Sequence, residues 1–102
     1  MGKLVRDRIP EIMRAKELDP DTRVLSQDEY WAALLDKLDE EADELREAGR
    51  PEDRLEEAAD VYEVLSAITK AIGFSVAELR EAADRKRAAR GGFEERIWLD
   101  RW

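Results

Sequence analysis

The stretch SQDEYWAALLDKLDEEADELREAG, residues 26–49, is followed at once by RPEDRLEEAADVYEVLSAITKAIG, residues 50–73, and the two decide the fold. Ser26 and Glu29 have the spacing of a capping box, in which each side chain satisfies the other residue's backbone amide. Apolar residues then recur every three or four positions, which predicts one buried helical face. They are Trp31, Leu34, Leu35, Leu38, Ala42 and Leu45. The Gly-Arg-Pro sequence at residues 49–51 ends this helix.

A second long helix is predicted over residues 52–72, with Gly73 as its left-handed cap. The middle of this helix is apolar over a wide arc, so we expect it to be the most buried helix. Its apolar residues are Val61, Tyr62, Val64, Leu65, Ile68 and Ile72. Because the turn at residues 48–51 is short, the two long helices are expected to pack antiparallel.

Two shorter helices are predicted outside this pair, over residues 9–18 and 75–90, the second opening with another capping box. We expect residues 22–25 to be extended, and residues 93–102 either to form a short strand or to pack back on the helices. The predicted fold is therefore all-α: a single domain, residues 1–102, built as a bundle of about four helices with a short β-strand pair from the tails as an option. A chain of 102 residues has little room for a core of its own, so a homodimer or homotetramer is expected.

Composition excludes several kinds of chemistry. The chain has no cysteine and no histidine, so thiolate metal sites, disulfides and histidine general bases are all excluded. A metal site must use oxygen ligands, which suit Mg²⁺, Mn²⁺ or Ca²⁺. The net charge of −8 argues against binding duplex nucleic acid. No apolar run approaches the ~20 residues needed to span a bilayer, and we expect a cytoplasmic protein.

Four acids fall at the edge of the predicted buried faces instead of in solvent. Glu41 and Glu44 form an i,i+3 pair on the first long helix, and Glu57 and Asp60 form another on the second. In an antiparallel pair these carboxylates can face one another, and no basic residue is expected nearby, so a divalent metal is the simplest compensation. Glu40 is expected to point into solvent. The alternatives are an ordinary solvated acidic face and a di-iron carboxylate bundle, whose ExxH pairs need the histidine that this chain lacks.

The acid pattern resembles a known family signature. Residues 40–44, Glu-Glu-Ala-Asp-Glu, and residues 57–60, Glu-Ala-Ala-Asp, resemble the EExxE…ExxD motif of the all-α nucleotide pyrophosphohydrolases, which include MazG, the dimeric dUTPases and phosphoribosyl-ATP pyrophosphohydrolase. Residues 3–10, KLVRDRIP, and residues 90–97, RGGFEERI, resemble the two ends of a small MazG-like subgroup. The resemblance therefore covers nearly the whole chain.

This resemblance implies a helical bundle completed by a second subunit, and cleavage of the α–β phosphoanhydride of a nucleotide with Mg²⁺, or Mn²⁺ in its place. It implies Glu41, Glu44, Glu57 and Asp60 as metal ligands, with Glu40 and Glu41 as the catalytic acids. Glu40 matches the first acid of the motif and either holds a water or faces a partner subunit.

Phosphate oxygens of the substrate that are not bound by the metal are expected to be bound by Lys or Arg side chains. The candidates are Lys86 and Arg90 on the last helix, then Lys3 and Arg6 near the N-terminus; the alternative for each is a solvated surface charge. Four aromatic residues are candidates for stacking on a base, although each fits a core position better: Trp31, Tyr62, Phe93 and Trp98.

Two other functions stay open on the sequence alone. A MazG-like fold could bind a nucleotide or another protein without turnover, or the chain could be a structural helical dimer whose acids are solvated.

Overall fold

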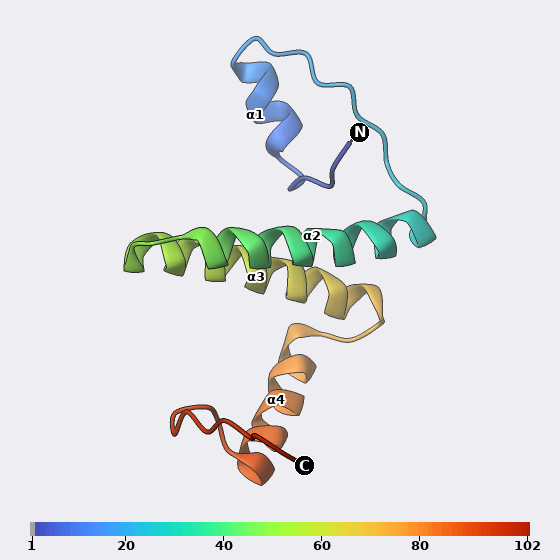
Figure 1. Cartoon of the computed structure of the whole chain (residues 1–102). Coiled ribbons are helices and arrows are strands. Elements are labelled where there is room, and N and C mark those ends of the chain that lie inside the picture. The colour runs from blue at the N-terminus through green and yellow to red at the C-terminus, as the bar shows by residue number, and fades with distance from the viewer. Residues whose placement is uncertain (1) are drawn as a thin grey trace.

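The computed structural model describes residues 2–102 and contains four α-helices, with no β-strand in that part of the chain (Figure 1). The helices are α1 (Ile9–Ala15), α2 (Gln27–Glu47), α3 (Pro51–Ala71) and α4 (Val76–Arg90). The predicted all-α fold is confirmed. The optional strand pair does not form, because the N-terminal segment and the C-terminal tail lie on opposite sides of α2 and α3.

α2 and α3 form an antiparallel hairpin whose start the sequence encodes locally. The Ser26 hydroxyl accepts a hydrogen bond from the backbone amide of Glu29 at 3.2 Å, and the Glu29 carboxylate accepts one from the amide of Ser26 at 3.0 Å. At the turn between the helices, the guanidinium of Arg54 donates to the carbonyl of Ala48 at 3.0 Å. Pro51 occupies the first turn of α3, where its missing N–H costs nothing.

The outer helices begin and end largely as predicted. Gly73 has a φ of 92°, which is the left-handed cap expected after α3. Ser75 and Glu78 form the second capping box. α1 is shorter than predicted, because Glu17 adopts a φ of 63° and ends the helix before Leu18.

The core of the hairpin is small. Leu34 and Val64 are the buried hydrophobic side chains of the described chain, 2% and 7% exposed, and they come from facing helices. Ser66 and Thr69 are also buried, and each hydroxyl donates to the carbonyl four residues earlier, at 2.9 and 2.7 Å. α3 contributes the most buried residues, as expected.

Much of the predicted core is exposed. Trp31 and Tyr62 are 39% and 51% exposed, and Phe93 and Trp98 are 95% and 84% exposed. The reason is that α4 contacts only α3 among the helices and projects away from the hairpin, as does the tail (Figure 1). The radius of gyration is 17.2 Å, against about 13 Å for a compact chain of this length.

None of the helices within residues 2–102 combines the length and the apolar character that a membrane crossing requires.

We expect Leu34→Ala to lower the free energy of unfolding by about 2–4 kcal/mol, because it leaves a cavity between α2 and α3. Chemical denaturation followed by circular dichroism measures this. Val24→Ala, at a position that is 96% exposed, is the control and should change stability by less than ~0.5 kcal/mol. Equal effects of the two variants would contradict the assigned core.

Candidate metal centre

Three glutamates meet where α2 faces the first half of α3. Glu41 and Glu44 come from α2 and Glu57 from α3, and one carboxylate oxygen from each lies within 4.8 Å of the others. Glu41 is buried, with 6% of its surface exposed, Glu57 is half-buried and Glu44 is exposed. The group therefore has a buried side against the helices and an open side toward solvent. We call these three residues the acid cluster.

Two oxygens of the acid cluster lack any hydrogen-bond partner. They are Oε2 of Glu41 and Oε2 of Glu57, and both are buried. Buried carboxylate oxygens are nearly always hydrogen-bonded or coordinated, because an unsatisfied one has lost its hydration without replacement. Converging carboxylates of this kind fit a divalent ion that prefers oxygen ligands. The cluster can therefore hold a metal ion.

The pKa values of two of these acids are raised by their surroundings. Loss of hydration raises the pKa of Glu57, and the negative charge of Glu44 raises it further. Loss of hydration likewise raises the pKa of Glu41, while the ammonium of Lys37 works in the opposite direction. Both carboxyls thus hold a proton more tightly than ordinary glutamates, as expected of acids that are buried close to one another.

Asp60, the fourth predicted ligand, lies beside the acid cluster but outside it. Its Oδ1 accepts a hydrogen bond from the guanidinium of Arg6 at 2.6 Å. Asp60 is close enough to contribute to the raised pKa of Glu57. The structure therefore brings three of the four predicted ligands together and pairs the fourth with the N-terminal segment.

Two expectations about charge near the cluster are wrong. Glu40 was expected to point into solvent, but it is half-buried, with its Oε1 3.4 Å from the ammonium of Lys37 and 3.8 Å from that of Lys3. No basic residue was expected nearby, yet Lys37 Nζ lies 3.3 Å from Oε1 of Glu41. The i,i+4 spacing of Lys37 and Glu41 is the sequence signal that would have revealed this pair.

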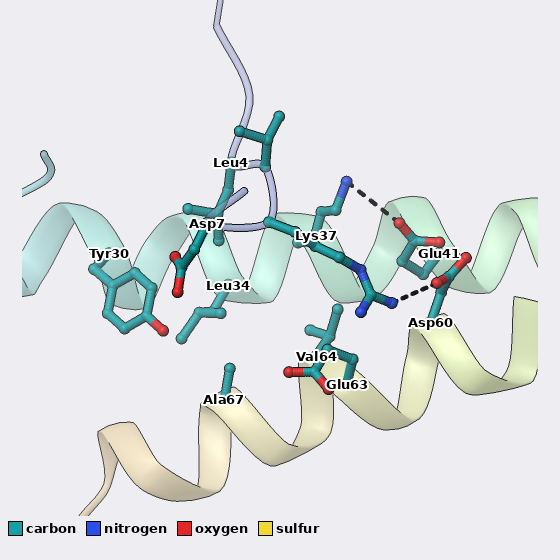
Figure 2. A pocket seen from close by; sticks show the side chains of 12 residues that line it. Leu4, Asp7, Tyr30, Leu34, Lys37, Glu41, Asp60, Glu63, Val64 and Ala67 are labelled. Carbon is teal, nitrogen blue, oxygen red and sulfur yellow. Dashed lines mark hydrogen bonds and ion pairs between the residues drawn. The ribbon is translucent and has the colours of Figure 1, made fainter. Parts of the chain in front are cut away.

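A cavity of about 300 Å³ adjoins the acid cluster (Figure 2). Its walls are α2, α3 and the N-terminal segment, residues 4–7, which crosses the hairpin. Lys37, Glu41 and Asp60 line one end, with Arg6 paired to Asp60, and the ring of Tyr30 lies at the other end. Among the described aromatic residues it is Tyr30 that lines this cavity, and none of the four aromatic candidates from the sequence does so.

The predicted phosphate ligands separate into two groups. Lys3 forms an ion pair with Glu40, and Arg6 forms one with Asp60, so both lie beside the acids. Lys86 and Arg90 are on α4, which makes no contact with α2 in the described chain. The structure therefore places the N-terminal pair, and not the α4 pair, beside the acid cluster of the same chain.

Comparison with known proteins gives one relative of interest, an uncharacterized protein of Mycolicibacterium smegmatis that is 59% identical over 56 residues. The match covers 55% of this chain and 57% of the relative, so it spans little more than half of either protein. No family model matches the chain, and no solved structure matches it.

The raised pKa of Glu57 predicts how stability depends on pH in metal-free buffer. A carboxyl whose pKa is raised by folding stabilises the folded state below its ordinary value of 4.5, and that contribution is lost as the pH rises through the raised value. We therefore expect the free energy of unfolding of Glu57→Gln, relative to the unmodified protein, to increase as the pH rises above 4.5.

Denaturant titrations in EDTA between pH 4 and 8 measure this difference. Glu56→Gln is the matched control, because Glu56 is the exposed neighbour of Glu57 and lies outside the acid cluster. A pH profile for Glu57→Gln that parallels the unmodified protein would contradict the assigned environment of this carboxyl.

Proposed function

We propose that this chain is a MazG-like, metal-dependent nucleotide pyrophosphohydrolase of the cytoplasm. It cleaves the α–β phosphoanhydride of a nucleoside triphosphate or of a related phosphoribosyl nucleotide, giving a monophosphate and pyrophosphate. The observation that carries the proposal is the pair of buried, unpartnered carboxylate oxygens of Glu41 and Glu57 inside the acid cluster. The motif resemblance of residues 40–44 and 57–60 supports it.

The proposed metal ligands are Glu41, Glu44 and Glu57, joined by Asp60 once Arg6 has released it. Mg²⁺ or Mn²⁺ held there would neutralise phosphate charge and lower the pKa of a bound water. The protein's own residues supply the rest. Arg6 and Lys3 reach Asp60 and Glu40 from the N-terminal segment, and in this proposal they bind phosphate oxygens of the substrate. In this proposal Glu40, half-buried beside the acid cluster, accepts a proton from the attacking water.

The adjoining cavity suits the rest of a nucleotide. Its volume of about 300 Å³ falls at the lower end of small-molecule sites, which span ~300–1,000 Å³. The charged end of the cavity borders the acid cluster, and the opposite end carries the ring of Tyr30. We therefore propose that the phosphates lie toward Arg6 and Lys37, and that Tyr30 packs against the base.

The direct test is release of pyrophosphate with Mg²⁺ or Mn²⁺ across a panel of nucleoside triphosphates and phosphoribosyl-ATP. We expect one or a few substrates to be cleaved, and Glu57→Ala and Asp60→Ala each to lose at least ~100-fold in kcat/KM. Glu56→Ala, on the same helix and outside the cluster, is the control and should retain activity. Full activity in both acid variants would contradict the assignment.

A second candidate is a nucleotide-binding module without turnover. The Arg6–Asp60 ion pair at 2.6 Å favours it, because it keeps the fourth acid from joining the other three. Saturable nucleotide binding in calorimetry, without product after long incubation over several metals, would support this function. A structural helical dimer is the remaining alternative, and it requires that neither Mg²⁺ nor Mn²⁺ changes the melting temperature.

We also propose that the chain works as a homo-oligomer. Its accessible surface is 9350 Å², which is about 3,400 Å² more than the roughly 5,900 Å² expected for a compact chain of this mass. Tyr62, Leu65 and Ile72 are 51%, 39% and 54% exposed, and their spacing puts them on one face of α3 and its cap. Obligate dimer interfaces bury ~2,000–5,000 Å² in total, or about 1,000–2,500 Å² from each chain, so a second copy would cover a large part of this excess.

Charge complementarity between α4 and α2 supports association with a second copy. The last two turns of α4 are basic, with Arg85, Lys86, Arg87 and Arg90, while the second half of α2 is rich in acids. Two copies can place α4 of one against α2 of the other, which would also bring Lys86 and Arg90 toward an acid cluster.

Light scattering after size exclusion should give the mass of two or four chains. Leu65→Lys places a charge on the exposed face of α3 and should lower that mass, whereas Val24→Lys, in the exposed linker, should not. A monomer at micromolar concentration, with native circular dichroism, would contradict the proposal.

A further inference from the structure

Lys37 is held in an unusual place for a lysine. Its side chain is 17% exposed, although lysines are almost always solvated. It follows Leu34 by three residues on α2, so its stem runs along the buried face of the helix while its ammonium reaches the acids one turn further on. The ammonium lies 3.3 Å from Oε1 of Glu41 and 3.4 Å from Oε1 of Glu40.

The other two cations near the site are engaged elsewhere. Arg6 pairs with Asp60, and Lys3 pairs with Glu40. Among the ion pairs of residues 2–102, the acid cluster therefore receives one positive charge, from Lys37, against three carboxyl groups. Lys37 contacts one oxygen of Glu41, and the other oxygen, Oε2, is the one without a partner.

A divalent ion and the ammonium of Lys37 compete for the same carboxylate. Positive charges a few ångströms apart repel strongly where water is partly excluded. The lysine ammonium is a compact charge on a flexible four-carbon stem, so it can leave Glu41 without any movement of the helix. Lys37 also lines the cavity next to the cluster, where the displaced ammonium would find the phosphates of a bound nucleotide (Figure 2).

We propose that Lys37 is a tethered counter-cation: it neutralises Glu41 while metal is absent, yields that carboxylate when a divalent ion binds, and then binds a phosphate oxygen of the substrate. The last step rests on the proposed function, whereas the exchange with metal does not. Lys37 thus stabilises the folded protein around the acid cluster when metal is absent. It also lowers the affinity of the cluster for metal until its ammonium binds a phosphate of the nucleotide.

Calorimetric titration of the whole protein with Mn²⁺ alone tests the exchange. Lys37→Met should bind Mn²⁺ at least about fivefold more tightly than the unmodified protein, because the competing charge is gone. Its melting temperature in EDTA should be lower, and its rise on adding Mn²⁺ should be larger. Lys37→Arg keeps the charge and should bind Mn²⁺ no more tightly than the unmodified protein.

Lys70→Met is the matched control, since it removes one exposed positive charge near the other end of α3 and should change Mn²⁺ affinity by less than about twofold. If Lys37→Met does not fold in EDTA, recovery of its circular dichroism spectrum on adding Mn²⁺ supports the exchange, and absence of recovery overturns it. Unchanged or weaker Mn²⁺ binding by folded Lys37→Met overturns it as well, as does absence of binding by both proteins.

Pyrophosphate release by the unmodified protein separates this inference from the proposed function. Activity together with unchanged Mn²⁺ affinity in Lys37→Met overturns the role of Lys37 alone. Tighter Mn²⁺ binding by Lys37→Met, with no product from any substrate, overturns the hydrolase and supports the exchange of ammonium for metal.

Discussion

The packing of α2 against α3 forces Glu41, Glu44 and Glu57 to face one another, and the rest of the site depends on that repulsion. Burial removes water from two of the carboxylates and raises the pKa of both. Three cations lie around these acids: Lys37 of α2 pairs with Glu41, and Lys3 and Arg6 of the N-terminal segment pair with the neighbouring acids Glu40 and Asp60. These two ion pairs tie the N-terminal segment to the hairpin, where it forms one wall of the cavity.

Burying carboxylates lowers the stability of the folded protein, and this is unusual in so small a core. Leu34 and Val64 are the buried apolar side chains of the described chain, and Leu34 lies two turns before Glu41 on the same face of α2. A protein that needed only stability would place apolar residues at all such positions, since unpaired buried charge destabilises the folded state. Retaining glutamates there is consistent with a functional demand for negative charge, and divalent metal and phosphate chemistry supplies one.

The helices could be predicted from sequence because their signals are local. Capping boxes at Ser26 and Ser75 and the left-handed Gly73 mark ends that depend on neighbouring residues alone. The exposed aromatic residues could not be predicted, because burial depends on what packs against each face, and α4 leaves most of the hairpin uncovered. At the site, the i,i+3 spacing was enough to identify the acids. The ion pairs of Glu40 with Lys3 and of Asp60 with Arg6 could not be predicted, because they join residues far apart in the chain and no helical periodicity indicates them.

The central claim is that the acid cluster binds a divalent metal ion. Crystals grown with Mn²⁺ and measured at a wavelength where manganese scatters anomalously locate the ion directly. We expect an anomalous peak beside the carboxylate oxygens of Glu41, Glu44 and Glu57, with the ammonium of Lys37 moved away from Glu41. A map without a peak there, in which Lys37 still contacts Glu41 at saturating Mn²⁺, would contradict it.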